Sequence, residues 1–224
     1  EWFEDGQKRR ERNFKNGERD STWNTWYENG NKRFLATYSD GKLSGKYIRW
    51  YQGGIIKEQD GNYINNKKHN KWVFWDKNGQ KSEEINYNTG IQNGPHIKWF
   101  GDSSDQHKEF HKNFKNGEKD GAWHYWYTTG VDSLKSSYLE GKKDGHWVWW
   151  RSNGLKDKEG FYKKEKKHGV WTVWNDSSGT AYHKLHEETF VNDIIDGSVT
   201  KWYKEGDIDR QGVMRGKERE GEWT

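Results

Sequence analysis

The sequence predicts an all-β fold: an elongated, twisted antiparallel β-meander of tandem hairpin repeats of about 24 residues, mostly in a single layer. Three observations lead to this prediction. Tryptophan recurs at nearly constant spacing along all 224 residues. A turn signal rich in Gly and Asn returns every ten to twelve residues, which is typical of an all-β chain. The chain holds one Pro, and no apolar stripe of helical period is long enough for a helix.

One row of tryptophans sets the period of the repeat. Successive members are separated by 24, 24, 25, 24, 27, 24, 24 and 28 residues. A position that is Trp in every repeat is what a repeated packing contact demands, so we expect these residues to be the structural rungs of the sheet. This main row consists of Trp2, Trp26, Trp50, Trp75, Trp99, Trp126, Trp150, Trp174 and Trp202.

A looser aromatic row lies three residues before the main row. Residues three apart on a strand point to opposite faces, so the two rows belong to different faces of the sheet. We expect the looser row to be the more exposed one and to offer rings to a partner. Its tryptophans, the candidate partner-binding residues, are Trp23, Trp72, Trp123, Trp147 and Trp171.

Two kinds of turn mark the ends of the strands. An Asn-Gly or related turn follows the main Trp, as in 28-ENG-30 and 77-KNG-79. A Gly-rich connection follows a second ring later in the repeat, as in 38-YSDGKLSG-45 and 138-YLEGKKDG-145. Gly and Asn tolerate the positive φ that tight hairpin turns require. Strands of six to eight residues are expected between these turns.

Aromatic rings take the place of an aliphatic core. Hydrophobic residues make up only 29% of the chain and aromatic residues 17%, while 33% of residues are charged. A half-enclosed ring still contributes about 2–3 kcal/mol through its buried area. Lys and Arg stems can cover ring faces while their charges stay in water. The composition is therefore compatible with a folded sheet.

The repeat resembles the variant form of the MORN repeat (membrane occupation and recognition nexus). The residues that carry the likeness are 38-YSDGKLSGKYIRWY-51, 114-FKNGEKDGAWHYWY-127 and 138-YLEGKKDGHWVWW-150. The likeness covers residues 1–224 as a single array of about nine hairpin repeats, incomplete at both ends. It implies a protein-interaction scaffold, sometimes membrane-associated, and extends to bacterial exported proteins and to a group named as antitoxins.

The chain departs from this family pattern in two respects. It has Trp where the family more often has Tyr. Two repeats are lengthened, over 99–114 and 174–190, and they carry 101-GDSSD-105 and 175-NDSSG-179. Long loops on a rigid scaffold often carry function, although such irregularity is equally compatible with sequence drift.

No constellation of residues predicts catalysis, a cofactor or a metal site. His107 and His111 are four residues apart, a spacing that places them about 13 Å apart on a strand. His183 and His186 fall on opposite strand faces. There is no Cys. We therefore expect a protein that is not an enzyme and that uses no cofactor.

The predicted function is binding through an extended aromatic-rich sheet surface, with a protein as the partner. The alternatives are a toxin-neutralising, antitoxin-like protein and a module that binds cell-wall polysaccharide. The near balance of 39 basic and 35 acidic residues argues against nucleic acid as the partner.

The remaining predictions concern location and assembly. No apolar run reaches the roughly 18 residues of a membrane-spanning helix. Bare sheet edges would invite end-to-end self-association. The family likeness favours an exported or cell-envelope location in a bacterium.

Overall fold

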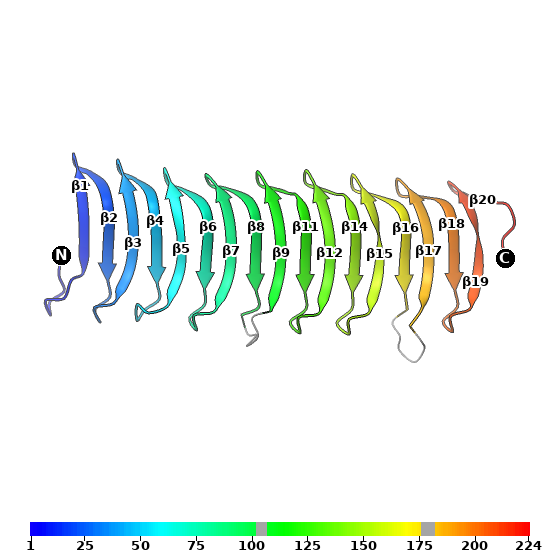
Figure 1. Cartoon of the computed structure of the whole chain (residues 1–224), viewed down its shortest axis with the longest axis horizontal. Coiled ribbons are helices and arrows are strands. Elements are labelled where there is room, and N and C mark those ends of the chain that lie inside the picture. Colours follow the sequence, from blue (N-terminus) through cyan, green and yellow to red (C-terminus); the bar gives the residue numbers. More distant parts are fainter. Residues whose placement is uncertain (102–106, 176–181) are drawn as a thin grey trace. The chain divides into compact units, whose positions relative to one another are not determined.

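The computed structural model describes residues 1–101, 107–175 and 182–224. In this part of the chain the regular elements are all strands (Figure 1). The chain forms two compact units: unit 1 runs from Glu1 to Glu118 and unit 2 from Lys119 to Thr224. The predicted all-β class is confirmed. The single array of nine repeats stays a prediction.

Unit 1 is an antiparallel meander in which each strand pairs with the next one along the chain. Its strands are β1 (Arg10–Lys15), β2 (Glu18–Trp26), β3 (Lys32–Ser39), β4 (Lys42–Trp50), β5 (Lys57–Ile64), β6 (Lys67–Trp75), β7 (Lys81–Asn88), β8 (Ile91–Trp99) and β9 (Lys108–Lys115).

Unit 2 repeats this arrangement, and the short strand β10 (Glu118–Lys119) falls at the boundary between the units. Here too, neighbouring strands pair in antiparallel fashion, and β12 pairs with both β13 and β14. Its strands are β11 (Gly121–Trp126), β12 (Asp132–Leu139), β13 (Lys142–Lys143), β14 (Gly145–Trp150), β15 (Lys156–Lys163), β16 (Lys166–Trp174), β17 (Lys184–Val191), β18 (Ile194–Trp202), β19 (Ile208–Arg215) and β20 (Glu218–Glu220).

The hairpin turns are tighter than the sequence suggested. Two residues with positive φ close most of the two-residue hairpins, such as Asn16 (φ 52°) with Gly17 (φ 81°) and Lys164 (φ 49°) with Glu165 (φ 73°). This is the turn whose twist matches that of the flanking strands. The residues after the turn pair at once, so Leu43 lies opposite Tyr38. The second half of the predicted connection 38–45 is therefore strand, and most strands have eight or nine residues.

A β-bulge recurs at the main-row tryptophans from Trp26 to Trp202. Trp26 pairs with Lys32, whereas the preceding Thr25 pairs with Phe34, which leaves one extra residue on the partner strand. The same shift occurs at the equivalent positions in both units. The other tryptophans at which the register shifts are Trp50, Trp75, Trp99, Trp126, Trp150, Trp174 and Trp202.

The two faces of each sheet carry different side chains. We call the face with the looser row the core face, because most of the buried hydrophobic side chains belong to it. The face with the main row is the outer face. Trp72 on the core face is the only large side chain that is fully buried among the described residues.

Candidate functional site

The looser row forms the core of each unit. Trp72, Trp123, Trp147 and Trp171 are buried, and Trp23 is half-buried. The prediction that this row is the more exposed one is therefore wrong. No open ring face is left at the four buried residues, so we look elsewhere for a binding surface.

Glycine explains how a single layer can bury an indole. A Cβ atom on Gly61 would lie 2.3 Å from Cδ2 of Trp72, and a Cβ on Gly160 would lie 2.2 Å from Cδ2 of Trp171. These two indoles thus lie directly on the backbone of the neighbouring strand, where a Cβ atom would clash with the ring in its present position. The ring covers the strand and is itself shielded from water on that side.

Four of the core indoles donate a hydrogen bond from the ring N–H group. Nε1 of Trp72 donates to the carbonyl oxygen of Asn62 at 3.0 Å, and Nε1 of Trp171 donates to that of Phe161 at 3.0 Å. Trp23 and Trp147 make the same bond to the residue ten positions earlier. A buried N–H without a partner would be costly, so this bond helps to fix the ring in place.

A basic side chain covers the other side of each core indole. The cation lies four residues before the Trp: Nζ of Lys68 is 4.4 Å from the ring centroid of Trp72, and Nζ of Lys167 is 4.5 Å from that of Trp171. The further pairs are Arg19 with Trp23, Lys119 with Trp123, Lys143 with Trp147 and Arg219 with Trp223.

This pairing has a signal in the sequence that our prediction of the two faces did not use. Where the core position is Trp, the residue four places earlier is Lys or Arg. Where it is not Trp, that residue is uncharged: Leu43 before Tyr47, Gln92 before His96 and Ile195 before Val199. Lys or Arg therefore occurs at this position only where the core residue is Trp, as expected if the basic residue is there for a cation–π contact.

In unit 1, His96 occupies the core-row position at which other repeats have Trp23 and Trp72. Its Nε2 atom lies 2.6 Å from Oε1 of Glu83, and its Nδ1 atom lies 2.8 Å from Nε2 of Gln92. The hydrogen bond with His96 lowers the pKa of Glu83, against the opposing effect of partial burial. The ring also meets Phe110 edge-on at 5.0 Å. The imidazole is thus held in a fixed orientation in place of an indole.

The main row lies on the outer face, and its rings alternate with lysines. In several repeats, the Lys that pairs with one main-row Trp reaches over the next Trp along the sheet. Lys57 pairs with Trp50 and lies 5.8 Å from the ring centroid of Trp75, and Lys156 pairs with Trp150 and lies 5.4 Å from that of Trp174. Trp2 is 66% exposed and the other members are half-buried. Their role as structural rungs stays a prediction.

A side chain after each of several main-row tryptophans links one repeat to the next. The hydroxyl of Tyr27 donates to the carbonyl oxygen of Trp50 at 2.7 Å, and Tyr51 and Tyr127 make the same bond to Trp75 and Trp150. These bonds fix the spacing of successive hairpins within each unit.

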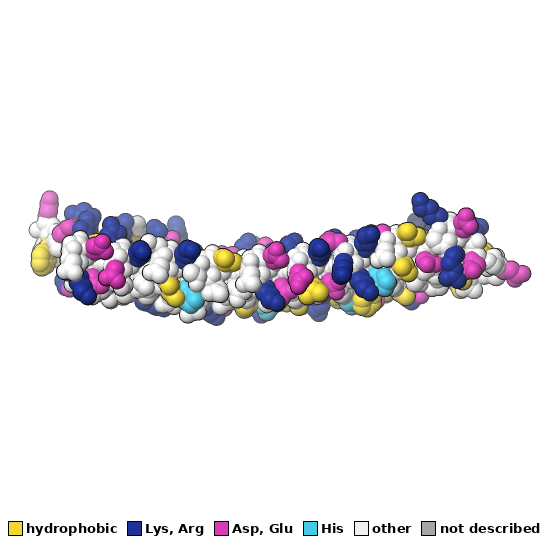
Figure 2. All heavy atoms as spheres, turned by 90° about the horizontal axis from the view of Figure 1, so that it is seen from above, with side chains coloured by type: hydrophobic (Ala, Val, Ile, Leu, Met, Phe, Trp, Pro, Cys, Tyr) yellow, Lys and Arg dark blue, Asp and Glu magenta, His cyan; other side chains and the backbone are white. Residues whose placement is uncertain are grey.

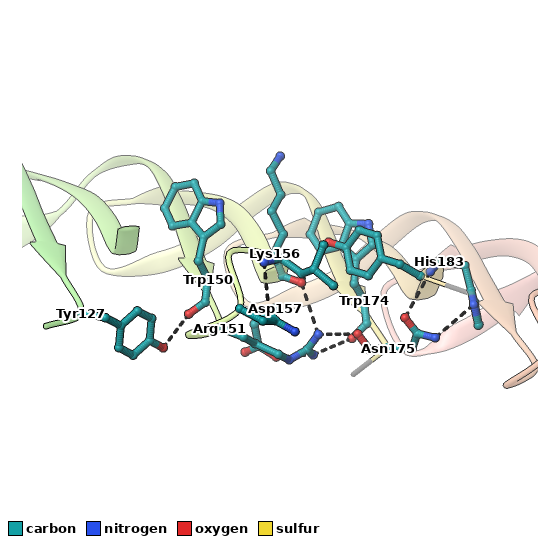
Figure 3. A network of polar contacts seen from close by, with 11 residues as sticks. Tyr127, Trp150, Arg151, Lys156, Asp157, Trp174, Asn175 and His183 are labelled. Atoms are coloured by element: carbon teal, nitrogen blue, oxygen red, sulfur yellow. Dashed lines mark hydrogen bonds and ion pairs between the residues drawn. The ribbon is translucent and has the colours of Figure 1, made fainter. Parts of the chain in front are cut away.

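Arginine replaces tyrosine at the next such link, beside a lengthened repeat (Figure 3). Nη2 of Arg151 donates to the carbonyl oxygen of Trp174 at 3.0 Å, and the guanidinium also pairs with Asp157 at 2.6 Å. Asn175 and His183 hydrogen-bond each other at the base of the connection. This network anchors both ends of the lengthened segment.

The loop sequences singled out above fall largely outside the described residues. Of 101-GDSSD-105 only Gly101 is described, and of 175-NDSSG-179 only Asn175. Among the described residues, no group of three or more His, Asp or Glu is placed to hold a metal ion. His183 instead contacts the carbonyl oxygen of Tyr203 at 3.0 Å. Burial and the charge of Lys108 lower the pKa of His111.

One stripe of the outer face differs between the units. In unit 2 the rings of His146 and Phe161 stack at 4.6 Å, and the stripe continues through Val170, Thr189, Ser198 and Val213 on the following strands. Phe161, Val170 and Val213 are exposed. The equivalent positions of unit 1 are polar or charged: Lys46, Asn62, Lys71 and Asn86. Unit 2 therefore presents an apolar stripe, and unit 1 does not.

Charges elsewhere are mixed in sign. Figure 2 shows acidic and basic side chains interspersed on the side that it presents. Ion pairs such as Lys98 with Glu109 at 2.7 Å neutralise many of them. Across the described residues no helix is long and apolar enough to cross a membrane.

Known proteins do not assign the chain to a family. No protein-family model matches the chain, and no curated protein matches it. The likeness to variant MORN repeats stays a prediction based on the motifs of the sequence.

Proposed function

We propose that the chain is a binding protein that docks another protein on the outer face of unit 2. The observation that carries the proposal is the apolar stripe of Phe161, Val170 and Val213. Exposed apolar side chains that gather on one face of a soluble protein are typical of an interaction surface. The equivalent positions of unit 1 show that the sheet itself does not require apolar residues there.

Polysaccharide binding has less support. A sugar stacks on the free face of an aromatic ring, and on the outer face lysines lie over rings such as Trp75 and Trp174. A toxin-neutralising role would be a narrower case of the same proposal, with one tight partner. The resemblance to MORN scaffolds favours a protein partner, and end-to-end self-association also stays a prediction.

A pair of matched baits tests this proposal. Phe161→Glu places a charge in the stripe, and Asn62→Glu places the same charge at the equivalent position of unit 1. Proteins and glycans captured from lysate and envelope fractions of the source organism would be compared for three baits, including the unaltered chain.

We expect one protein that is captured at fixed stoichiometry by the unaltered chain and by Asn62→Glu, and that is lost with Phe161→Glu. Capture that survives Phe161→Glu would contradict the proposal. Capture of glycan by all three baits would favour the polysaccharide alternative.

A further inference from the structure

A hollow lined by rings and arginines lies on the core face of unit 1. It has a volume of about 980 Å³ and extends over β1 to β4. Its arginines are Arg9, Arg10, Arg12, Arg33 and Arg49. Glu28 is the one acidic residue among those that line it. This hollow, which we call the arginine groove, has a strongly positive wall.

Aromatic rings hold three of these guanidinium groups. The Cζ atom of Arg9 lies 5.7 Å from the ring centroid of Phe3, that of Arg12 lies 5.4 Å from the Trp23 ring, and that of Arg33 lies 5.7 Å from the Tyr27 ring. A guanidinium that rests on a ring keeps its N–H donors free in its own plane. The rings thus orient donors that suit an oxyanion and reduce the entropy lost on binding.

Arginine is concentrated in this region of the chain. Six of its ten arginines precede residue 50, and none lies between residues 50 and 150. Elsewhere lysines such as Lys68 and Lys143 cover core rings equally well. Covering a ring therefore does not require arginine. The planar fork of arginine adds two-point binding of a carboxylate, which lysine cannot offer.

The groove already accepts a carboxylate from its own chain. Oε2 of Glu1 lies 3.5 Å from Nη1 of Arg10, and Oε1 of Glu1 lies 3.5 Å from Nη1 of Arg12. Arg49 pairs with Glu58 at 2.9 Å. Arg9 and Arg33, by contrast, contact rings and have no ion pair with the described residues. Donors therefore remain for further carboxylates.

We propose that the arginine groove binds an acidic peptide segment of a protein partner. Three strand spacings from β1 to β4 amount to about 14 Å, which four extended residues at about 3.3 Å each would fill. Single-stranded nucleic acid would need open ring faces for its bases, and guanidinium groups cover these faces. The groove belongs to unit 1 and the apolar stripe to unit 2, so either proposal can fail alone.

Fluorescence anisotropy with a labelled tetraglutamate peptide tests the proposal on the full chain. A tetraglutamine peptide and a thymidine oligonucleotide of equal charge serve as comparison probes. The variant Arg12→Gln with Arg33→Gln removes two ring-held guanidinium groups. Arg210→Gln with Arg215→Gln removes the same charge from unit 2 and is the matched control. Thermal unfolding would verify that both variants fold.

We expect tetraglutamate to bind, tetraglutamine not to bind, and the groove variant to weaken binding at least about tenfold, while the control changes it by less than about twofold. Lysine at positions 12 and 33 should restore only part of the affinity because the fork is lost. No binding of tetraglutamate, an equal loss in the control, full rescue by lysine, or equally tight binding of the oligonucleotide would each overturn the proposal.

Discussion

Trp72 and Trp75 stand three residues apart on β6 and belong to the two faces of the sheet. Trp72 on the core face is fully buried, rests on Gly61 and donates to the carbonyl oxygen of Asn62. Trp75 on the outer face is half-buried, and Lys57 reaches over its ring. The same residue type is thus a buried core residue on one face and a partly solvent-exposed residue on the other. What differs is the space that the neighbouring strand leaves for the ring.

The largest loss of stability is expected when a ring is removed from the core face. Trp72→Ala removes a fully buried indole and should lower the free energy of unfolding by about 3–5 kcal/mol. Trp75→Ala should cost only about 1–2 kcal/mol because part of that ring already faces water. Urea unfolding of both variants measures the difference. Equal costs would mean that the two faces are equally enclosed, contrary to their exposure.

The glycine beneath the ring gives the next largest effect. Gly61→Ala would place a Cβ atom 2.3 Å from Trp72 and force the indole off the strand. Overpacking of this kind costs about 1–3 kcal/mol. Gly101→Ala is the control, since no described atom lies within 4 Å of its Cβ position. If thermal unfolding finds the two variants equally stable, the indole does not depend on the glycine.

The sequence predicted the repeat correctly but assigned the faces wrongly. Turn residues such as Asn16 and Gly17 and the Trp spacing determine where strands begin and end, because these are local properties. Burial is not local, because it depends on neighbouring strands: Trp72 rests on Gly61 and Trp171 on Gly160. The invariance of the main row suggested a core. Its members from Trp26 to Trp202 instead share a bulge in the pairing, and most of them pair with a lysine. Both features can recur without full burial.

The polar candidate features were harder to predict for the same reason. Glu83 and His96 are thirteen residues apart and meet only because β7 pairs with β8. The arginine groove likewise combines residues from several strands. The excess of arginine before residue 50 was visible in the sequence, but its arrangement around rings was not.

Two adjacent carboxylates extend the comparison to acid stability. Glu83 on the core face bonds His96, and Glu84 on the outer face pairs with Lys81 at 2.8 Å. The bond with His96 lowers the pKa of Glu83. For Glu84, burial acts in the opposite direction, but the bonds from Lys71 and Lys81 outweigh it and lower the pKa.

A lowered folded-state pKa means that each ionised carboxylate stabilises the fold at pH values above about 4.3, the unfolded value. That stability is lost as the pH falls through the lower folded-state pKa. Glu83→Gln and Glu84→Gln should therefore each flatten the acid limb of the stability curve, by about 1 kcal/mol. Since the two side chains share no partner, the double variant should be additive within about 0.5 kcal/mol. If unfolding experiments between pH 7 and 3 gave a larger coupling free energy, Glu83 and Glu84 would not act independently on the two faces.

The smallest effect separates the stem of a lysine from its charge. Burial lowers the pKa of Lys68, so its ammonium is held over Trp72 at some cost, and we attribute its main contribution to the methylene stem that covers the ring. Lys68→Ala should cost about 1 kcal/mol, and Lys68→Met, which keeps an apolar stem, should restore most of it. On the outer face Nζ of Lys57 donates to Asp60 at 2.7 Å, so Met should not restore what Lys57→Ala loses. Urea unfolding of the four variants decides between stem and charge. If Met fails at position 68, the cation itself stabilises the core indole, and the lysines of the two faces act alike.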